Sequence, residues 1–128
     1  MSSKEIEEWE AKAKALADKY NVGVYLLFND SMGVNDPTPS QRNEFARDYF
    51  IEHKLGVGPD SDGIIFVVSL RTRDYVTVAK GKGVSALDKD IDAIESAIVA
   101  YLKFDDWNGA AKTYYELVGS ALENYSNA

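Results

Sequence analysis

The feature that most constrains this chain is an uninterrupted apolar run at residues 64–68, Ile-Ile-Phe-Val-Val, preceded by Asp60, Asp62 and Gly63. A run this short and this rich in β-branched residues favours a strand over a helix. Because no position in it is polar, both faces of the strand must be covered. The run therefore predicts the central strand of a sheet that carries a layer of structure on each side.

A second strand is predicted at residues 75–79, Tyr-Val-Thr-Val-Ala, after a polar segment at 71–74. The short separation favours an antiparallel hairpin. We interpret Arg73 and Asp74 as a charged turn whose two side chains hold each other. The hairpin puts Asp60 and Asp62 at one end of the central strand and Arg73 at the other, so chemistry is expected at those ends.

The N-terminal part of the chain predicts a helix followed by a strand. Apolar residues recur at helical spacing up to Tyr20, after a capping box formed by Ser2 and Glu5. Asn21 ends this helix, and the mostly apolar residues 22–28 then predict a strand beside the central one.

A second helix is predicted after a loop at residues 29–39 that is rich in Asn, Asp, Ser, Gly and Pro. It begins with a capping box of Thr38 and Gln41, with Pro39 at the first helical position. The segment at residues 55–59 ends it before the central strand.

Two more helices are predicted in the C-terminal third. Asp88 caps the first of them, Asp90 lies in its first turn, and its buried stripe includes Tyr101. Asp106 caps the last helix. The tail at residues 124–128 is expected to fray.

The glycines at residues 80–83, Lys-Gly-Lys-Gly, do not form a nucleotide-binding motif. The segment lacks the spacing and the Lys-Ser/Thr ending of a phosphate-binding loop, and no third glycine completes a dinucleotide fingerprint. We interpret these glycines as positions that let the chain leave the strand.

Length and element order predict one domain over residues 1–128, an α/β sandwich with three or four strands. The formal charge of −7 and the pI near 4.6 argue against a nucleic-acid partner. No apolar stretch is long enough for a membrane helix, so this segment is not expected to insert into a bilayer, and residues 1–5 are not a signal peptide.

Several short motifs together resemble the TPM domain family. They are Asp62-Gly63 opening the apolar strand, Arg73-Asp74-Tyr75 at the hairpin, Gly81-Lys82-Gly83, and the segment at 106–109, Asp-Trp-Asn-Gly. The likeness extends over nearly the whole chain in order. The chain departs from the family pattern at two points. Ser85 replaces an acidic residue, and the Asp of a Thr-Asp pair is either replaced by Lys89 or shifted by one residue to Asp88 or Asp90.

The resemblance implies a three-layer α/β/α sandwich with a small mixed sheet. It also implies a location outside the cytoplasm, in a full-length protein anchored to a membrane. The family has been linked to divalent-cation binding and, in plant members, to acid phosphatase activity. No organic cofactor is implied.

Four carboxylates are candidate ligands for Ca²⁺ or Mg²⁺, because these ions prefer oxygen ligands with negative charge. They are Asp60 and Asp62 before the central strand, and Asp88 and Asp90 at the start of the third predicted helix. Each also has a purely structural interpretation as a turn or cap residue.

Two functions from different classes remain open. A metal-dependent acid phosphatase would use Asp62 and Arg73 as its catalytic candidates, although no recognised nucleophile motif accompanies them. A binding or scaffolding module for a membrane-protein or cell-envelope partner would use exposed aromatic residues, for which Trp107, Tyr114 and Tyr115 are the candidates. We expect the binding module.

Overall fold

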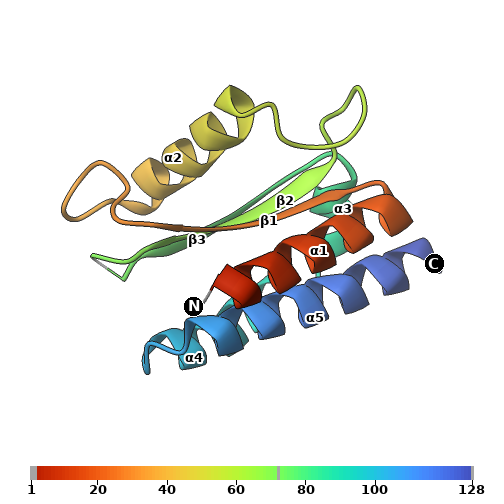
Figure 1. Cartoon of the computed structure of the whole chain (residues 1–128). Helices are drawn as coiled ribbons and strands as arrows, with labels where there is room; N and C mark the ends of the chain where they lie inside the picture. The colour runs from red at the N-terminus through yellow and green to blue at the C-terminus, as the bar shows by residue number, and fades with distance from the viewer. Residues whose placement is uncertain (1–2, 72, 128) are drawn as a thin grey trace.

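The computed structural model describes residues 3–71 and 73–127. Five helices and three strands follow one another along these residues (Figure 1): α1 (Ser3–Tyr20), β1 (Gly23–Asn29), α2 (Pro39–Glu52), β2 (Gly63–Ser69), β3 (Tyr75–Lys80), α3 (Lys82–Leu87), α4 (Ile91–Leu102) and α5 (Trp107–Ser126).

The sheet is mixed, with β2 between β1 and β3. Strand β1 runs parallel to β2, in a register that pairs Gly23 with Gly63 and Asn29 with Ser69. Strand β3 runs antiparallel to β2, and Lys80 pairs with Gly63. The predicted central strand and the predicted hairpin are both confirmed.

Helices cover both faces of the sheet, as the apolar run at β2 requires. Helix α2 lies on one face, and α1, α4 and α5 lie on the other (Figure 1). Every residue of β2 is buried, and its side chains alternate between two cores. Ile64, Phe66 and Val68 pack toward α1 and α5, whereas Ile65 and Val67 pack toward α2. The predicted α/β/α sandwich is therefore confirmed.

Two of the capping predictions are confirmed, at the starts of α2 and α5. Thr38 and Gln41 form the reciprocal capping box of α2. The Asp106 carboxylate accepts the backbone N–H of Gly109 at 2.9 Å and begins α5. The Ser2 half of the first capping box lies outside the described residues.

Helix α3 was not predicted, and it changes the role of Asp88. The chain turns directly from β3 into α3, and Asp88 follows as its C-cap residue. Helix α4 begins at Ile91, after Asp90, whose side chain makes no capping hydrogen bond. The prediction that Asp88 caps the next helix is therefore wrong, because a short helix already occupies the preceding six residues.

One further prediction from helical spacing is wrong. Tyr101 is 40% exposed at the end of α4 and is not part of the buried stripe. Helix α5 continues to Ser126, into the tail that was expected to fray. No glycine or proline interrupts residues 123–126, and the Asn127 N–H still donates to the Glu123 carbonyl at 3.1 Å.

Tyr114 and Tyr115 are buried, which contradicts their predicted role as exposed partner contacts. The Tyr114 hydroxyl donates a hydrogen bond to the Tyr25 carbonyl at 2.7 Å, across the α5 face of the sheet. Tyr115 stacks on Trp9, with ring centroids 5.8 Å apart. Each hydroxyl group sits at the end of a ring that helps fill the core, so both tyrosines act in packing.

Because Tyr114 and Tyr115 are buried, we expect the protein to lose stability at alkaline pH. Burial raises the pKa of Tyr114 well above its usual value, and burial together with the Glu10 charge raises the pKa of Tyr115 to about 12. The unfolded chain releases these protons near pH 10, so their contribution is complete below about pH 10 and is lost as the pH rises toward 12. Urea unfolding at several pH values measures how steeply the free energy of unfolding falls with pH.

The slope should become smaller in Tyr115→Phe. It should be unchanged in Tyr125→Phe, which alters a 40% exposed ring and serves as the matched control. A free energy of unfolding that stays constant between about pH 9 and pH 11.5 would show that neither hydroxyl is held protonated by burial.

Candidate functional site

The sheet has two chemically different ends. Asp62 precedes β2, beside the start of β1 and the end of β3, while Arg73 lies in the turn at the other end. A strand rises about 3.3 Å per residue, so the six steps from Gly63 to Ser69 separate the ends by roughly 20 Å. The two catalytic candidates, Asp62 and Arg73, therefore cannot reach one substrate group in this arrangement.

The Asp62 carboxylate is used to begin α3. Asp62 is only 9% exposed, and its Oδ1 atom accepts the backbone N–H of Lys82 at 2.8 Å. Its backbone carbonyl accepts N–H groups from Gly23 and Val57, both at 3.0 Å. A Cβ atom on Gly81 would lie 1.9 Å from Oδ1, so glycine is required for the carboxylate to approach the helix start.

The other three predicted metal ligands lie apart from this arrangement. Asp60 is exposed in the turn before β2, Asp88 is exposed after α3, and Asp90 is partly exposed before α4. Within residues 3–71 and 73–127, no three Asp, Glu or His side chains gather as metal ligands. Ca²⁺ takes about six to eight oxygen ligands, so the described carboxylates do not fit such a site as they stand.

At the other end of the sheet, Arg73 joins the hairpin to the loop between α4 and α5. Its guanidinium group forms an ion pair with Asp105 at 2.5 Å and lies over the Trp107 ring, 5.0 Å from the centroid. Asp74 instead pairs with Arg42 at 3.6 Å, so the predicted pairing within the turn is wrong. The reason is backbone geometry, because Arg73 adopts a left-handed φ of 63° and its side chain reaches another element.

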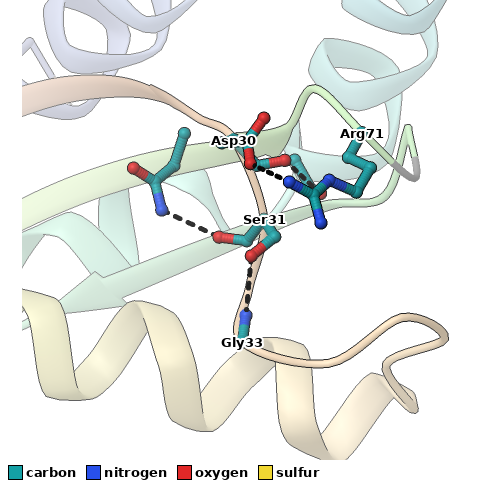
Figure 2. A network of polar contacts seen from close by, with 6 residues as sticks. Asp30, Ser31, Gly33 and Arg71 are labelled. Carbon is teal, nitrogen blue, oxygen red and sulfur yellow. Dashed lines mark hydrogen bonds and ion pairs between the residues drawn. The ribbon is translucent and has the colours of Figure 1, made fainter.

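A second ion pair at this end connects the loop after β1 to the same hairpin. Figure 2 shows the Arg71 guanidinium group donating to the Asp30 carboxylate at 2.6 Å. The Arg71 backbone N–H also donates to the Asp30 carbonyl at 2.9 Å. Beyond Asp30, the Ser31 hydroxyl accepts the Gly33 N–H at 3.3 Å (Figure 2). Both side chains of the ion pair are mostly exposed, so it positions the loop and adds little stability.

A pocket of about 450 Å³ lies between the hairpin and the end of α4. Its apolar wall is formed by Val68, Tyr75, Val99 and Leu102, and its charged groups are Arg73, Lys103 and Asp105. The described ion pairs include Arg73 with Asp105 but leave out Lys103. The pocket therefore carries an excess of positive charge in a chain whose formal charge is −7.

Sequence reasoning found Arg73 but missed Lys103 and Asp105. These two residues follow α4 in the chain, about 30 positions after the hairpin, and nothing in their local spacing points to Arg73. Phe104 lies between them and is 84% exposed. The only signal was the break in helical pattern at residues 104–109, which marked a loop without indicating what the loop contacts.

Comparisons with known proteins agree with this architecture. The TPM domain family matches residues 1–121. The NMR structure of the N-terminal domain of cg2496 from Corynebacterium glutamicum has a TM-score of 0.68 and 22% identity, covering 94% of this chain and 72% of that one. The NMR structure of BA42 from Bizionia argentinensis has a TM-score of 0.73 and 16% identity, covering 98% and 83%. No curated protein matches, and at these identities the two structures establish the fold alone.

The position of Asp62 predicts a structural role that stability measurements can separate from metal binding. Asp62→Ala removes a charge-assisted hydrogen bond from a nearly buried site, so it should lower the free energy of unfolding by about 2 kcal/mol. Asp62→Asn keeps an oxygen at the Oδ1 position, so its free energy of unfolding should fall by less than that of Asp62→Ala. Urea unfolding of all three proteins, with and without Ca²⁺, gives the comparison.

A ligand role for Asp62 would give a different pattern. Ca²⁺ would then stabilise the wild-type protein but neither variant, because a bound ion adds stability only to the state that holds it. We expect the cost of Asp62→Ala to be the same with and without the ion.

Proposed function

This chain belongs to the TPM domain family, and we propose that it is a binding module whose pocket at Arg73 takes an anionic group carried by a partner. The observation that supports the proposal is the make-up of that pocket. It combines two cationic side chains with an apolar wall and contains one carboxylate, Asp105, which is already paired.

The geometry favours binding because Arg73 is held in place before a ligand arrives. Asp105 and the Trp107 ring fix its guanidinium group, and a planar guanidinium can bind a carboxylate or phosphate through two parallel hydrogen bonds. Lys103 adds a second positive charge from the neighbouring loop. Val99, Leu102 and Tyr75 would contact the apolar part of the same ligand. The ligand class is therefore an acidic group attached to an apolar one.

The setting of this module is also a proposal. On the family resemblance, we place the domain outside the cytoplasm, in a parent protein anchored to a membrane, where it scaffolds membrane-protein or cell-envelope partners. Among the described helices, none has both the length and the apolar character needed to cross a bilayer.

Phosphatase activity and cation binding receive weaker support from the geometry. Phosphoryl transfer requires a nucleophile or an activated water close to the positive charge that binds the phosphate. Asp62 lies at the far end of β2 from Arg73, and the pocket carboxylate is bound to Arg73 itself. A Ca²⁺ or Mg²⁺ site is a separate proposal, and no step of the binding function depends on one.

Binding and turnover can be measured together with p-nitrophenyl phosphate, which joins an aromatic ring to a phosphate group. We expect it to shift the amide resonances of Arg73, Tyr75 and Lys103 in an NMR titration, without release of p-nitrophenolate. Arg73→Gln and Lys103→Gln should each weaken binding by roughly tenfold, the loss expected for one charged hydrogen bond.

Arg71→Gln is the matched control, because it removes the same charge from the same hairpin outside the pocket. It should leave the affinity within about twofold of wild type, since an exposed ion pair contributes little. Release of p-nitrophenolate that Asp62→Ala abolishes would support the phosphatase instead. If the ligand shifts other amide resonances but not those of Arg73 and Lys103, this pocket is ruled out as the binding site.

A further inference from the structure

Strand β1 forms an outer edge of the sheet with unused backbone groups. It pairs with β2 on one side and with no other described strand. In a parallel ladder, alternate residues direct their N–H and C=O groups toward the neighbouring strand. The Gly23 N–H donates to Asp62 and the Asn29 carbonyl accepts from Leu70, so the odd-numbered residues of β1 face β2. The backbone groups of Val24, Leu26 and Phe28 therefore face outward.

This edge lacks the features that normally prevent strands from pairing. Proteins usually protect an edge strand with charged residues, proline or a bulge. Strand β1 reads Gly-Val-Tyr-Leu-Leu-Phe-Asn, without charge or proline, and its register with β2 is continuous. The opposite edge differs, because β3 ends at Lys80 and its Thr77 hydroxyl donates to Glu95 of α4 at 2.8 Å.

A groove of about 310 Å³ wraps around the β1 edge. It is lined by Val24 and Leu26, which belong to the α1 face of the sheet, and by Tyr25 and Leu27, which belong to the α2 face. A single groove reaches both faces only by passing around the outside of the strand. A neighbouring hollow of about 270 Å³, lined by Leu26 and Phe28 with other residues, continues the apolar surface along the strand.

The two sides of the groove have room for side chains. On the α1 side the helix presents the small residues Ala13 and Ala17. On the other side α2 lies over β2 and β3, so Tyr25 and Leu27 are only partly covered (Figure 1). An added strand would place alternate side chains on these two apolar sides, as β2 does in the interior.

We propose that the β1 edge binds an extended peptide as a fourth strand, with apolar side chains on both faces and a basic residue opposite Glu10. Glu10 lines the groove and belongs to no described ion pair, whereas the nearby Lys14 is paired with Asp18 at 3.1 Å. A chain with a formal charge of −7 also favours a cationic partner. Main-chain hydrogen bonds would supply affinity, and the apolar groove and Glu10 would supply selectivity.

A second copy of this chain fits the edge less well than a peptide. Helix α1 packs over β1 itself. Pairing two β1 strands would bring them to about 4.8 Å apart, whereas two packed helices need about 8–10 Å between their axes. The α1 helices of the two copies would therefore collide before the strands could pair. A free peptide brings no such helix.

The site lies on a different surface from the pocket at Arg73, so the two proposals can fail separately. The test is an NMR titration of the whole chain with a synthetic peptide of about eight residues, a typical strand length, with a central Val/Ile run and a terminal Lys. We expect the amide resonances of Val24, Leu26 and Phe28 to shift. Methylating the alternate peptide nitrogens that would face β1 removes their hydrogen bonds to the β1 backbone. This change should weaken peptide binding at least tenfold. Arg73→Gln should have no effect.

Two variants test the edge itself. Leu26→Pro removes an outward N–H that belongs to no ladder hydrogen bond, and proline is tolerated on edge strands in this orientation. It should weaken binding at least tenfold, while the matched control Leu26→Val should not. Glu10→Lys should reverse the charge preference, so that a peptide ending in Glu binds better than one ending in Lys.

Three outcomes would overturn the proposal. The first is equal binding of the methylated and unmethylated peptides. The second is a charge preference that Glu10→Lys leaves unchanged, a measurement that does not depend on the folding of Leu26→Pro. The third is concentration-dependent dimerisation in sedimentation that Leu26→Pro abolishes, which would assign the edge to a second copy of the chain.

Discussion

Strand β2 is the constraint on which the rest of this structure depends. Its seven residues are all buried, and side chains on both of its faces are apolar apart from Ser69 at the end. Burying apolar surface yields about 25 cal/mol per Å², which the strand gains only if both faces are covered. The α2 layer and the α1–α4–α5 layer satisfy that requirement. They also leave only the ends and edges of the sheet available for binding.

The two ends of the sheet have become different kinds of surface. At the amino end of β2, Asp62 is nearly buried and its carboxylate begins α3, so that end is closed by structure. At the other end, Arg73 and Asp105 both adopt left-handed φ angles, which non-glycine residues rarely do, and their side chains form an ion pair. The ion pair joins two strained turns beside an open pocket. Strain of this kind is common where a protein holds a side chain ready for a ligand.

The proposed binding function also suits the charge distribution. The chain is acidic overall, yet at the hairpin Arg71 and Arg73 are each matched by a carboxylate, and Lys103 adds positive charge. Selective recognition of an acidic group needs such a local exception to the overall charge. The β1 edge presents the opposite combination, an apolar groove bordered by Glu10, which belongs to none of the described ion pairs. On the two proposals, one small domain offers two surfaces with different chemical preferences.

Local sequence patterns accounted for most of the secondary structure. The β-branched run of β2, the hairpin, the capping box of Thr38 and the cap at Asp106 were predictable because each depends on residues close together in the chain. Helix α3 was missed because its six residues lack a helical apolar period and because its start depends on Asp62, about 20 positions earlier.

The candidate site was less predictable, for the same physical reason. The sequence alone determined that Asp62 and Arg73 lie at opposite ends of the central strand, since a strand fixes the distance between its ends. Only the tertiary structure decided that Arg73 pairs with Asp105 and that Tyr114 and Tyr115 are buried. It also decided that, within the part of the chain it describes, no three of the candidate aspartates gather as metal ligands. Those outcomes depend on how α4 and α5 pack against the sheet. Packing brings together residues that are far apart in the chain, and their spacing in the sequence does not indicate that they are in contact.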